Sequence, residues 1–339
     1  MELKEQELDK LYQSYGFKKI ASGYPNVAAY SLQTGHFLNA DIIPLQPITN
    51  LEKVRKEYVE SGYACTIREY DSIEEADEDL FLGFFAAKSS RCRLNQEYQK
   101  YSGKISSKIN LPYEYIPTPY EVIPTQTVQD VNLFPQHLDL LSHIIQILNS
   151  NNGPSLILLE AAAGFGKTCT AYETIKRLIE GENNKVPIIT ELSRNRAASI
   201  FRYVLLDEID LNFPTLSSNL VKSQIQKGRI PVIIDGFDEL IRKKSEKDEK
   251  FEDAEPMLET ISDLLSGQAK VILTTRRSAV FTDDEFYNWV EAQSEKFQLF
   301  RFTIHNPTIR DWLPANRLEQ LKNANIPLNQ LSNPVLLSY

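Results

Sequence analysis

Four short apolar runs in the second half of the chain have the length and composition of buried strands. They are residues 156–159, 186–189, 231–234 and 270–273. Each is rich in Val, Ile or Leu, and helix-periodic sequence lies between several of them, which is typical of a parallel sheet covered by helices on both faces. The pattern predicts an α/β fold, with a three-layer αβα core and a mostly parallel sheet.

The first 110 residues follow a different pattern. Apolar faces predict helices at residues 7–15, 51–61 and from 73 towards 101, a hairpin of strands at 26–32 and 37–45 around Thr34-Gly35, and a strand at 65–68. These elements predict a small α+β domain with an effector or interaction role. Residues 111–127 carry four prolines and are expected to form an extended linker.

The predicted organisation therefore has four segments. They are an N-terminal α+β domain at 1–110, a Pro-rich linker at 111–127, an α/β core at 128–304, and the start of a helical lid at 305–339.

A glycine-rich loop follows the apolar run at 156–159. The residues expected to bind a nucleotide are Ala161, Ala162, Ala163, Gly164, Phe165, Gly166, Lys167, Thr168 and Cys169. A strand, a glycine loop and Gly-Lys-Thr at a helix start form the context of a phosphate-binding P-loop. Backbone amides and the helix dipole would hold the β-phosphate, Lys167 would reach the β- and γ-phosphates, and the Thr168 hydroxyl would ligate Mg²⁺. Ala161 replaces the usual first glycine, and a chance Gly-Lys-Thr turn is the alternative.

A carboxylate ends the apolar run at 231–234. Asp235 is placed where it would hold Mg²⁺ or its bound water beside Thr168, as in a Walker B element. Asp238 and Glu239 follow at a spacing that would face the γ-phosphate, and one of them would orient the attacking water. The alternative is a core strand followed by a polar loop.

The run at 270–273 ends in Thr274-Thr275-Arg276. An arginine at the tip of this strand is suited to stabilising transition-state charge or to sensing the γ-phosphate. The alternative is a plain surface arginine. The acidic sequence 207–210 lies on helical periodicity and is expected to be a solvated helix face.

Taken together, these residues resemble a NACHT-type NTPase of the STAND class, chiefly through Asp-Gly-Phe-Asp-Glu at 235–239. The resemblance covers roughly 130–339, with Arg277 where the family usually has proline. It implies a switch that binds ATP or ADP with Mg²⁺, hydrolyses ATP slowly and self-associates in the ATP state. GTP is not excluded. Pro334 would open the lid and pack near the base.

The resemblance further implies a bacterial anti-phage immune protein whose N-terminal part this chain would be. An unknown trigger, such as a phage component, would then act through a C-terminal sensor outside this sequence. Two rivals stay open: a constitutive AAA+-type motor that remodels nucleic acid or protein, and an adaptor that holds nucleotide as a structural cofactor.

Composition narrows these classes. A net charge of −9 gives no strong signature of nucleic-acid binding and argues against binding to an anionic membrane surface. The three cysteines lack metal-ligand spacing and fit a reducing compartment. With no apolar run of membrane-spanning length, the expected location is cytoplasmic.

The N-terminal domain offers one further candidate chemistry. Its α-β-β-α-β order suggests a restriction-endonuclease-like core with Asp41 late in the second strand, but no Glu-x-Lys follows where it should, so an active nuclease is not expected. The acidic cluster at 74–79 is expected to be a helix N-terminus favoured by the macrodipole, with a metal site as the alternative.

Overall fold

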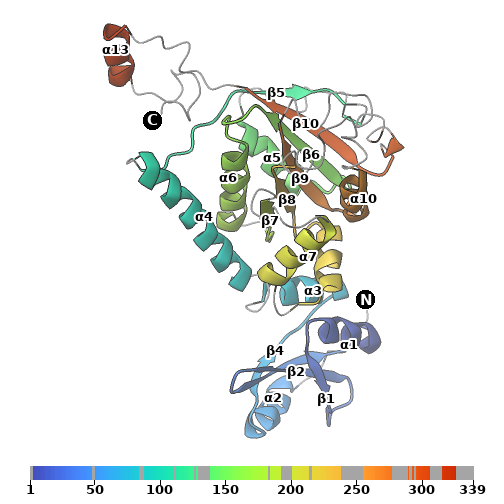
Figure 1. The fold of residues 1–339 in the computed structure, drawn as a ribbon. Coiled ribbons are helices and arrows are strands. Elements are labelled where there is room, and N and C mark those ends of the chain that lie inside the picture. The colour runs from blue at the N-terminus through green and yellow to red at the C-terminus, as the bar shows by residue number, and fades with distance from the viewer. Residues whose placement is uncertain are drawn as a thin grey trace. The chain divides into compact units, whose positions relative to one another are not determined.

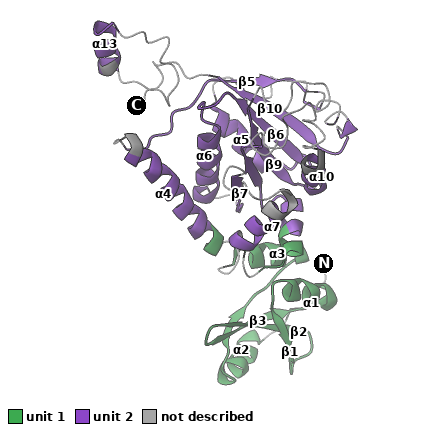
Figure 2. Ribbon diagram, in the orientation of Figure 1, with its two compact units in different colours: residues 1–90, 213–221 green, residues 91–212, 222–339 purple. Residues whose placement is uncertain are grey.

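The computed structural model describes residues 3–47, 50–83, 88–109, 112–125, 127–128, 138–181, 184–191, 201–213, 216–237, 255–276, 289, 292–293, 295–305 and 315–325. The chain divides into two compact units (Figure 2). Unit 1 is Met1–Ser90 with Phe213–Val221, and unit 2 is Arg91–Asn212 with Lys222–Tyr339. Each has its own sheet.

Unit 1 is the small α+β unit expected at the N-terminus. Its elements are α1 (Glu5–Ser14), β1 (Lys18–Ile20), β2 (Val27–Thr34), β3 (Phe37–Pro44), α2 (Leu51–Glu60), β4 (Ala64–Ile67) and α3 (Ile73–Leu82). The sheet order is β1-β2-β3-β4, antiparallel from β1 to β3 and parallel between β3 and β4. Val27, Ile42 and Val54 form a buried cluster between sheet and helix.

The predicted hairpin is confirmed, since Thr34 pairs with Phe37 across a turn in which Gly35 has a φ of 59°. Two predictions for this part of the chain were wrong. The strand β1 was missed, because two of its three residues are exposed lysines. The single long helix predicted from residue 73 is two helices, because α3 ends at Leu82, with Gly83 as its C-cap, and α4 (Ser89–Ile109) is a separate helix.

Unit 2 contains a six-stranded sheet in the order β5-β10-β6-β9-β8-β7 (Figure 1). The strands are β5 (Tyr120–Ile123), β6 (Ser155–Ala161), β7 (Ile188–Glu191), β8 (Val232–Asp235), β9 (Lys270–Thr275) and β10 (Gln298–Ile304). All neighbours are parallel except β5, which pairs antiparallel with β10. β6, β8 and β9 are buried along their whole length, as expected for strands covered on both faces.

The helices of unit 2 are α4, α5 (Leu140–Asn149), α6 (Lys167–Glu180), α7 (Phe201–Asn212), α8 (Ser218–Gln226, whose first residues belong to unit 1), α10 (Glu255–Leu264) and α13 (Ala315–Asn323). α6 packs against β6, β8 and β9 and against α5, whereas α7 packs against β7 and α10. Right-handed crossovers put α6 on one face and α7 and α10 on the other, as Figure 1 shows. The α/β class with a mostly parallel sheet is confirmed.

The Pro-rich segment is built into this sheet. Its residues 120–123 form β5, and the Tyr120 hydroxyl donates to the Leu138 carbonyl (2.9 Å) and contacts His143 Nδ1 (2.6 Å). Thr125 donates to the Leu299 carbonyl (2.8 Å). The two compact units separate at Ser90, not at the segment 111–127 where the sequence places its domain boundary, so α4 belongs with the α/β core.

The predicted acidic face at 207–210 lies on α7, where Asp207 and Asp210 are exposed and Ile209 is buried. In the region expected to begin the lid, the described residues include α13. Among the described residues, no helix is long and apolar enough to cross a membrane.

A buried lysine forms hydrogen bonds at the amino ends of β6 and β9, the edge of the sheet opposite the glycine loop. Lys270, at the start of β9, is 1% exposed. Its ammonium donates to the Gly153 carbonyl (2.6 Å) and to the hydroxyls of Ser155 (3.1 Å) and Ser150 (3.4 Å), all of them neutral. Burial, reinforced by the positive charge of Lys185, lowers the pKa of Lys270 to about 8.

This lysine predicts a pH dependence of stability. Because the folded pKa lies below the unfolded value of 10.5, the unfolded chain holds this proton between about pH 8 and 10.5 while the folded chain has lost it. The free energy of unfolding of the wild type should therefore rise relative to Lys270→Met by about 1–3 kcal/mol across that range. Urea unfolding at pH 7 to 10 measures the difference, and a difference that stays constant with pH contradicts it.

Candidate functional site

Three strands deliver the predicted site residues to one edge of the unit 2 sheet. β6 ends at Ala161, β8 at Asp235 and β9 at Thr275. Because these strands are parallel, with Glu160 beside Thr275 and Ile234 beside Leu273, their carboxyl ends lie together. Ligands of open α/β sheets bind at this edge.

The glycine loop connects β6 to α6. Gly164 and Gly166 have φ values of 85° and 91°, a region that side chains with a Cβ rarely occupy. α6 makes its first internal hydrogen bond from the Thr170 amide to the Gly166 carbonyl (2.8 Å). The amides before Thr170 therefore lie at the open end of the helix, where an anion is favoured.

Lys167 is folded back over this loop. Its ammonium donates to the carbonyls of Ala161 (2.8 Å) and Ala162 (3.1 Å). These contacts hold the positive charge above the loop, where phosphate oxygens could replace the carbonyls as acceptors.

Asp235 is the centre of the site and is 7% exposed. One carboxylate oxygen accepts a hydrogen bond from the Thr168 hydroxyl (2.7 Å), and the other accepts one from the Thr274 hydroxyl (2.5 Å). Thr274 in turn accepts from the Gly236 amide (3.0 Å). Gly236 has a φ of 79°, so glycine serves the turn that follows the carboxylate.

The role of Thr274 follows from the strand order. β9 lies between β6 and β8, so its tip stands between the glycine loop and Asp235. The sequence identified Thr274 only as part of a polar strand tip. Its contact with Asp235 could not be inferred without knowing which strand separates the other two.

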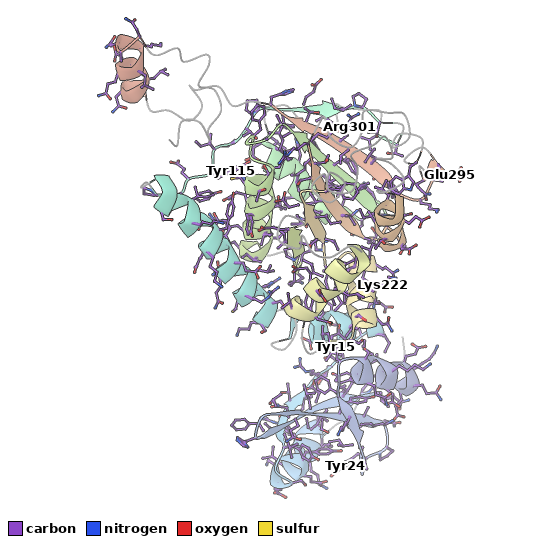
Figure 3. The ribbon with its side chains drawn as sticks, in the orientation of Figure 1. Tyr15, Tyr24, Tyr115, Lys222, Glu295 and Arg301 are labelled. Atoms are coloured by element: carbon purple, nitrogen blue, oxygen red, sulfur yellow. The ribbon has the colours of Figure 1, made fainter. Side chains whose placement is uncertain are left out.

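A second acid lies one residue before the loop. Glu160 is 1% exposed, and both of its oxygens accept from Arg301 on β10, at 2.7 and 3.1 Å; Figure 3 labels Arg301. The carboxylate is thus engaged by a bidentate partner, and Asp235 remains the acid that faces Thr168.

The structure also describes the predicted site residues Arg276 and Cys169. Arg276 directly follows β9 at the same sheet edge and is partly exposed. Asp238, Glu239, Arg277 and Pro334 lie outside the described residues. The side chain of Cys169 lies next to the Tyr113 hydroxyl (2.9 Å), and burial raises the pKa of its thiol. The sequence did not anticipate that neighbour.

Unit 1 holds a different polar cluster. Asp41 lies on β3, the third strand and not the second, because β1 was not counted in the sequence. The Arg68 guanidinium lies 2.9 Å from Asp41 and also pairs with Asp79, while Tyr70 donates to Asp79 (2.7 Å). Arginine therefore occupies the space between two carboxylates.

The acidic cluster at 74–79 is only partly solvated. Ser72 caps α3 by accepting from the Glu75 amide (3.1 Å), as expected for an acidic helix start. Asp77, by contrast, is 1% exposed and accepts from the Tyr15 hydroxyl (2.9 Å), so this acid packs inside unit 1. Among the described residues, no group of three or more His, Cys, Asp or Glu could hold a metal ion.

One protein family matches part of the chain. Residues 7–123 match the family described as NACHT-associated inactive Restriction Endonuclease 2. The match covers less than half of the chain, and it suggests a NACHT-containing protein. Its description agrees with the expectation that residues 1–110 are not an active nuclease. No curated protein matches the chain.

Solved structures show only distant likeness. The Aeropyrum pernix ORC2 protein in its ADP form is 14% identical, with a TM-score of 0.36, over 60% of this chain and 57% of that one. Drosophila ORC bound to poly(dA/dT) DNA and Cdc6 is 13% identical, with a TM-score of 0.30, over 54% and 29%. C. elegans PCH-2 is 12% identical, with a TM-score of 0.28, over 62% and 54%.

Two adjacent threonines test the hydrogen bonds around Asp235. Thr274 and Thr275 are both 0% exposed, but the Thr275 hydroxyl has no hydrogen-bond partner among the described residues. Thr274→Val should lower the free energy of unfolding by about 1–3 kcal/mol, because it leaves a buried carboxylate oxygen without its donor. Thr275→Val, the matched control, should leave stability unchanged or raise it. Chemical denaturation compares them, and equal effects would contradict this account.

Proposed function

We propose that unit 2 binds ATP and ADP with Mg²⁺ and hydrolyses ATP slowly, as a regulatory switch. The observation that carries this proposal is the contact of Asp235 with Thr168 at the start of α6, directly after a loop with two glycines in the left-handed region. A hydroxyl and a carboxylate at the open end of a helix supply the hard oxygen donors that Mg²⁺ prefers. GTP remains an alternative nucleotide.

The fit to Mg²⁺ can be judged from the oxygens themselves. The oxygens of Thr168 and Asp235 are 2.7 Å apart, and neighbouring ligands of an octahedral Mg²⁺ lie about 2.9 Å apart for metal–oxygen distances of about 2.05 Å. Mg²⁺, when bound, supplies charge neutralisation at the phosphates. Thr168 would ligate it, and Asp235 would hold it directly or through water.

The remaining roles rest on the sequence pattern. Lys167 would donate to the β- and γ-phosphates in place of its present carbonyl acceptors. Asp238 or Glu239 would orient the attacking water, and Arg276, at the same sheet edge as the loop, would face the γ-phosphate. Pro334 would pack near the base.

We further propose that the chain belongs to a NACHT-type signalling protein. The Asp-Gly-Phe-Asp-Glu sequence at 235–239 and the NACHT-associated match of residues 7–123 support this independently. In this proposal the ATP form self-associates in the cytoplasm, a trigger such as a phage component activates it, and the output is bacterial anti-phage defence. Unit 1 serves interaction and not cleavage.

A constitutive AAA+-type motor is the rival. The nucleotide released when the purified protein is denatured, together with its steady-state turnover, separates the two. Near-stoichiometric ADP with negligible turnover is expected of the switch. Rapid turnover with no retained nucleotide would instead favour the motor.

Lys167 provides a direct test of the binding site. Lys167→Ala should weaken ATP and ADP binding by at least about tenfold, because it removes the charge-assisted contact to the phosphates. The exposed Lys222 on α8 (Figure 3) provides the control, since Lys222→Ala removes the same charge elsewhere. Binding of a fluorescent nucleotide measures both, and equal affinities would refute the assigned site.

Asp235 should control the metal dependence of binding. Asp235→Asn retains the shape and can still accept from Thr168, but it loses the negative charge that a divalent cation requires. The gain in ATP affinity on adding Mg²⁺ should therefore shrink by about tenfold or more, while ATP binding in excess EDTA stays close to wild type. A Mg²⁺ response equal to that of the wild type would remove Asp235 from the metal site.

A further inference from the structure

One face of α6 is held by tyrosines from two other segments. Cys169, Tyr172, Glu173 and Lys176 have helical spacing i, i+3, i+4 and i+7 and so share this face. Their partners come from α4 and from the chain after it. We call Tyr98, Tyr101, Tyr113 and Tyr172 the tyrosine cluster.

Glu173 joins these segments at a single atom. Its Oε1 accepts hydrogen bonds from Tyr98 of α4 (2.7 Å) and from Tyr113 of the following segment (2.9 Å). Glu173 is 5% exposed and Tyr98 is 8% exposed. A buried carboxylate is costly without donors. Loss of either tyrosine hydroxyl should therefore weaken the packing of α4 and of the segment after it against α6.

The aromatic rings add packing to these hydrogen bonds. Tyr101 of α4 stacks on Tyr172 of α6, with centroids 4.0 Å apart and planes 4° apart. Tyr113 meets Tyr98 and Tyr101 edge to face, at 6.3 and 6.1 Å, a favoured arrangement for aromatic pairs. The Lys176 ammonium lies 5.2 Å from the centre of the Tyr98 ring.

Three hydroxyls of the cluster, those of Tyr98, Tyr101 and Tyr113, have a raised pKa and stay protonated. Burial is the main cause of the raised pKa in all three. The nearby Cys169 raises the pKa of each further, and Glu173 raises that of Tyr98 and Tyr113. The negative charge of Asp235 contributes to the raised pKa of Tyr101. A side chain of α4 therefore lies within electrostatic range of the carboxylate at the centre of the site.

The cluster also borders the glycine loop. Cys169 is the residue after Thr168, and its thiol contacts the Tyr113 hydroxyl. Further along the same segment, the Thr118 methyl lies 3.9 Å from where a Cβ of Gly166 would stand. Tyr115 lies between these two positions in sequence, and Figure 3 shows it beside α6. The segment 113–118 therefore runs from the second turn of α6 back to the loop.

We propose that nucleotide binding at the glycine loop and the packing of α4 against α6 are coupled through the tyrosine cluster. The inference rests on the proposed function, because it needs a nucleotide at the loop. α4 begins at Ser89 and unit 1 ends at Ser90, so this helix directly continues the chain of unit 1. Coupling is reciprocal. Bound nucleotide should stabilise the packing of α4 against α6, and weaker packing of α4 should lower the affinity of the glycine loop for nucleotide.

The test removes a contact that the nucleotide does not touch. Tyr98→Phe keeps the ring and deletes only the hydroxyl that reaches Glu173. It should weaken ADP and ATP binding by about fivefold or more, the lower end of usual coupling energies. Glu173→Leu should weaken binding more, because both hydroxyls lose their acceptor. Glu173→Gln keeps an acceptor oxygen and should retain most of the affinity. A requirement for side-chain bulk alone would instead predict normal binding for the Leu variant as well as for the Gln variant.

Hydrogen exchange of residues 91–107 provides the second readout. In the wild type, ADP or ATP with Mg²⁺ should slow the exchange of α4, and in Tyr98→Phe this protection should fall. Suppose that the wild type, Tyr98→Phe and Glu173→Leu bind nucleotide equally well and that nucleotide does not change the exchange rate of α4. The coupling is then refuted and the proposed function stands. A wild type that binds no nucleotide refutes the proposed function itself.

Discussion

The buried carboxylate of Asp235 must be satisfied on both oxygens, and that requirement fixes the site. One oxygen is held by a hydroxyl from the start of α6 and the other by a hydroxyl from the tip of β9. A charged group this deeply buried is costly unless such donors are present. The ends of three elements are therefore brought into register at one point, and the sheet order that places β9 between β6 and β8 makes this possible.

That these side chains lie at one edge of the sheet was largely predictable from sequence, whereas their surroundings were not. Lys167 and Thr168 come after a strand with a four-residue apolar run, and Asp235 directly follows another apolar run, so the local pattern locates them. β5 is hidden among prolines and β10 pairs with partners far along the chain. The tyrosine cluster joins residues 60 and 75 positions apart, which periodicity cannot detect. The roles of Asp238, Glu239 and Pro334 stay predictions.

Unit 1 illustrates how one side chain changes what a cluster can do. Asp41 and Asp79 both pair with the Arg68 guanidinium, which is always charged and presents its donors in a fixed geometry. The single guanidinium thus offsets one of the two negative charges and occupies the space between the carboxylates, which disfavours binding of a divalent ion there. This agrees with the proposal that unit 1 serves interaction and not cleavage.

The position of β6 in its sheet also constrains how the protein is made. Both neighbours of β6, namely β9 and β10, come later in the chain, and β10 ends only at Ile304. A ribosome adds about 5–20 residues per second, so β6 waits on the order of ten seconds or longer before both of its edges can pair. Such distant pairing slows folding and exposes apolar strands meanwhile. During synthesis, the glycine loop is thus assembled among the last parts of the domain, although its sequence emerges early.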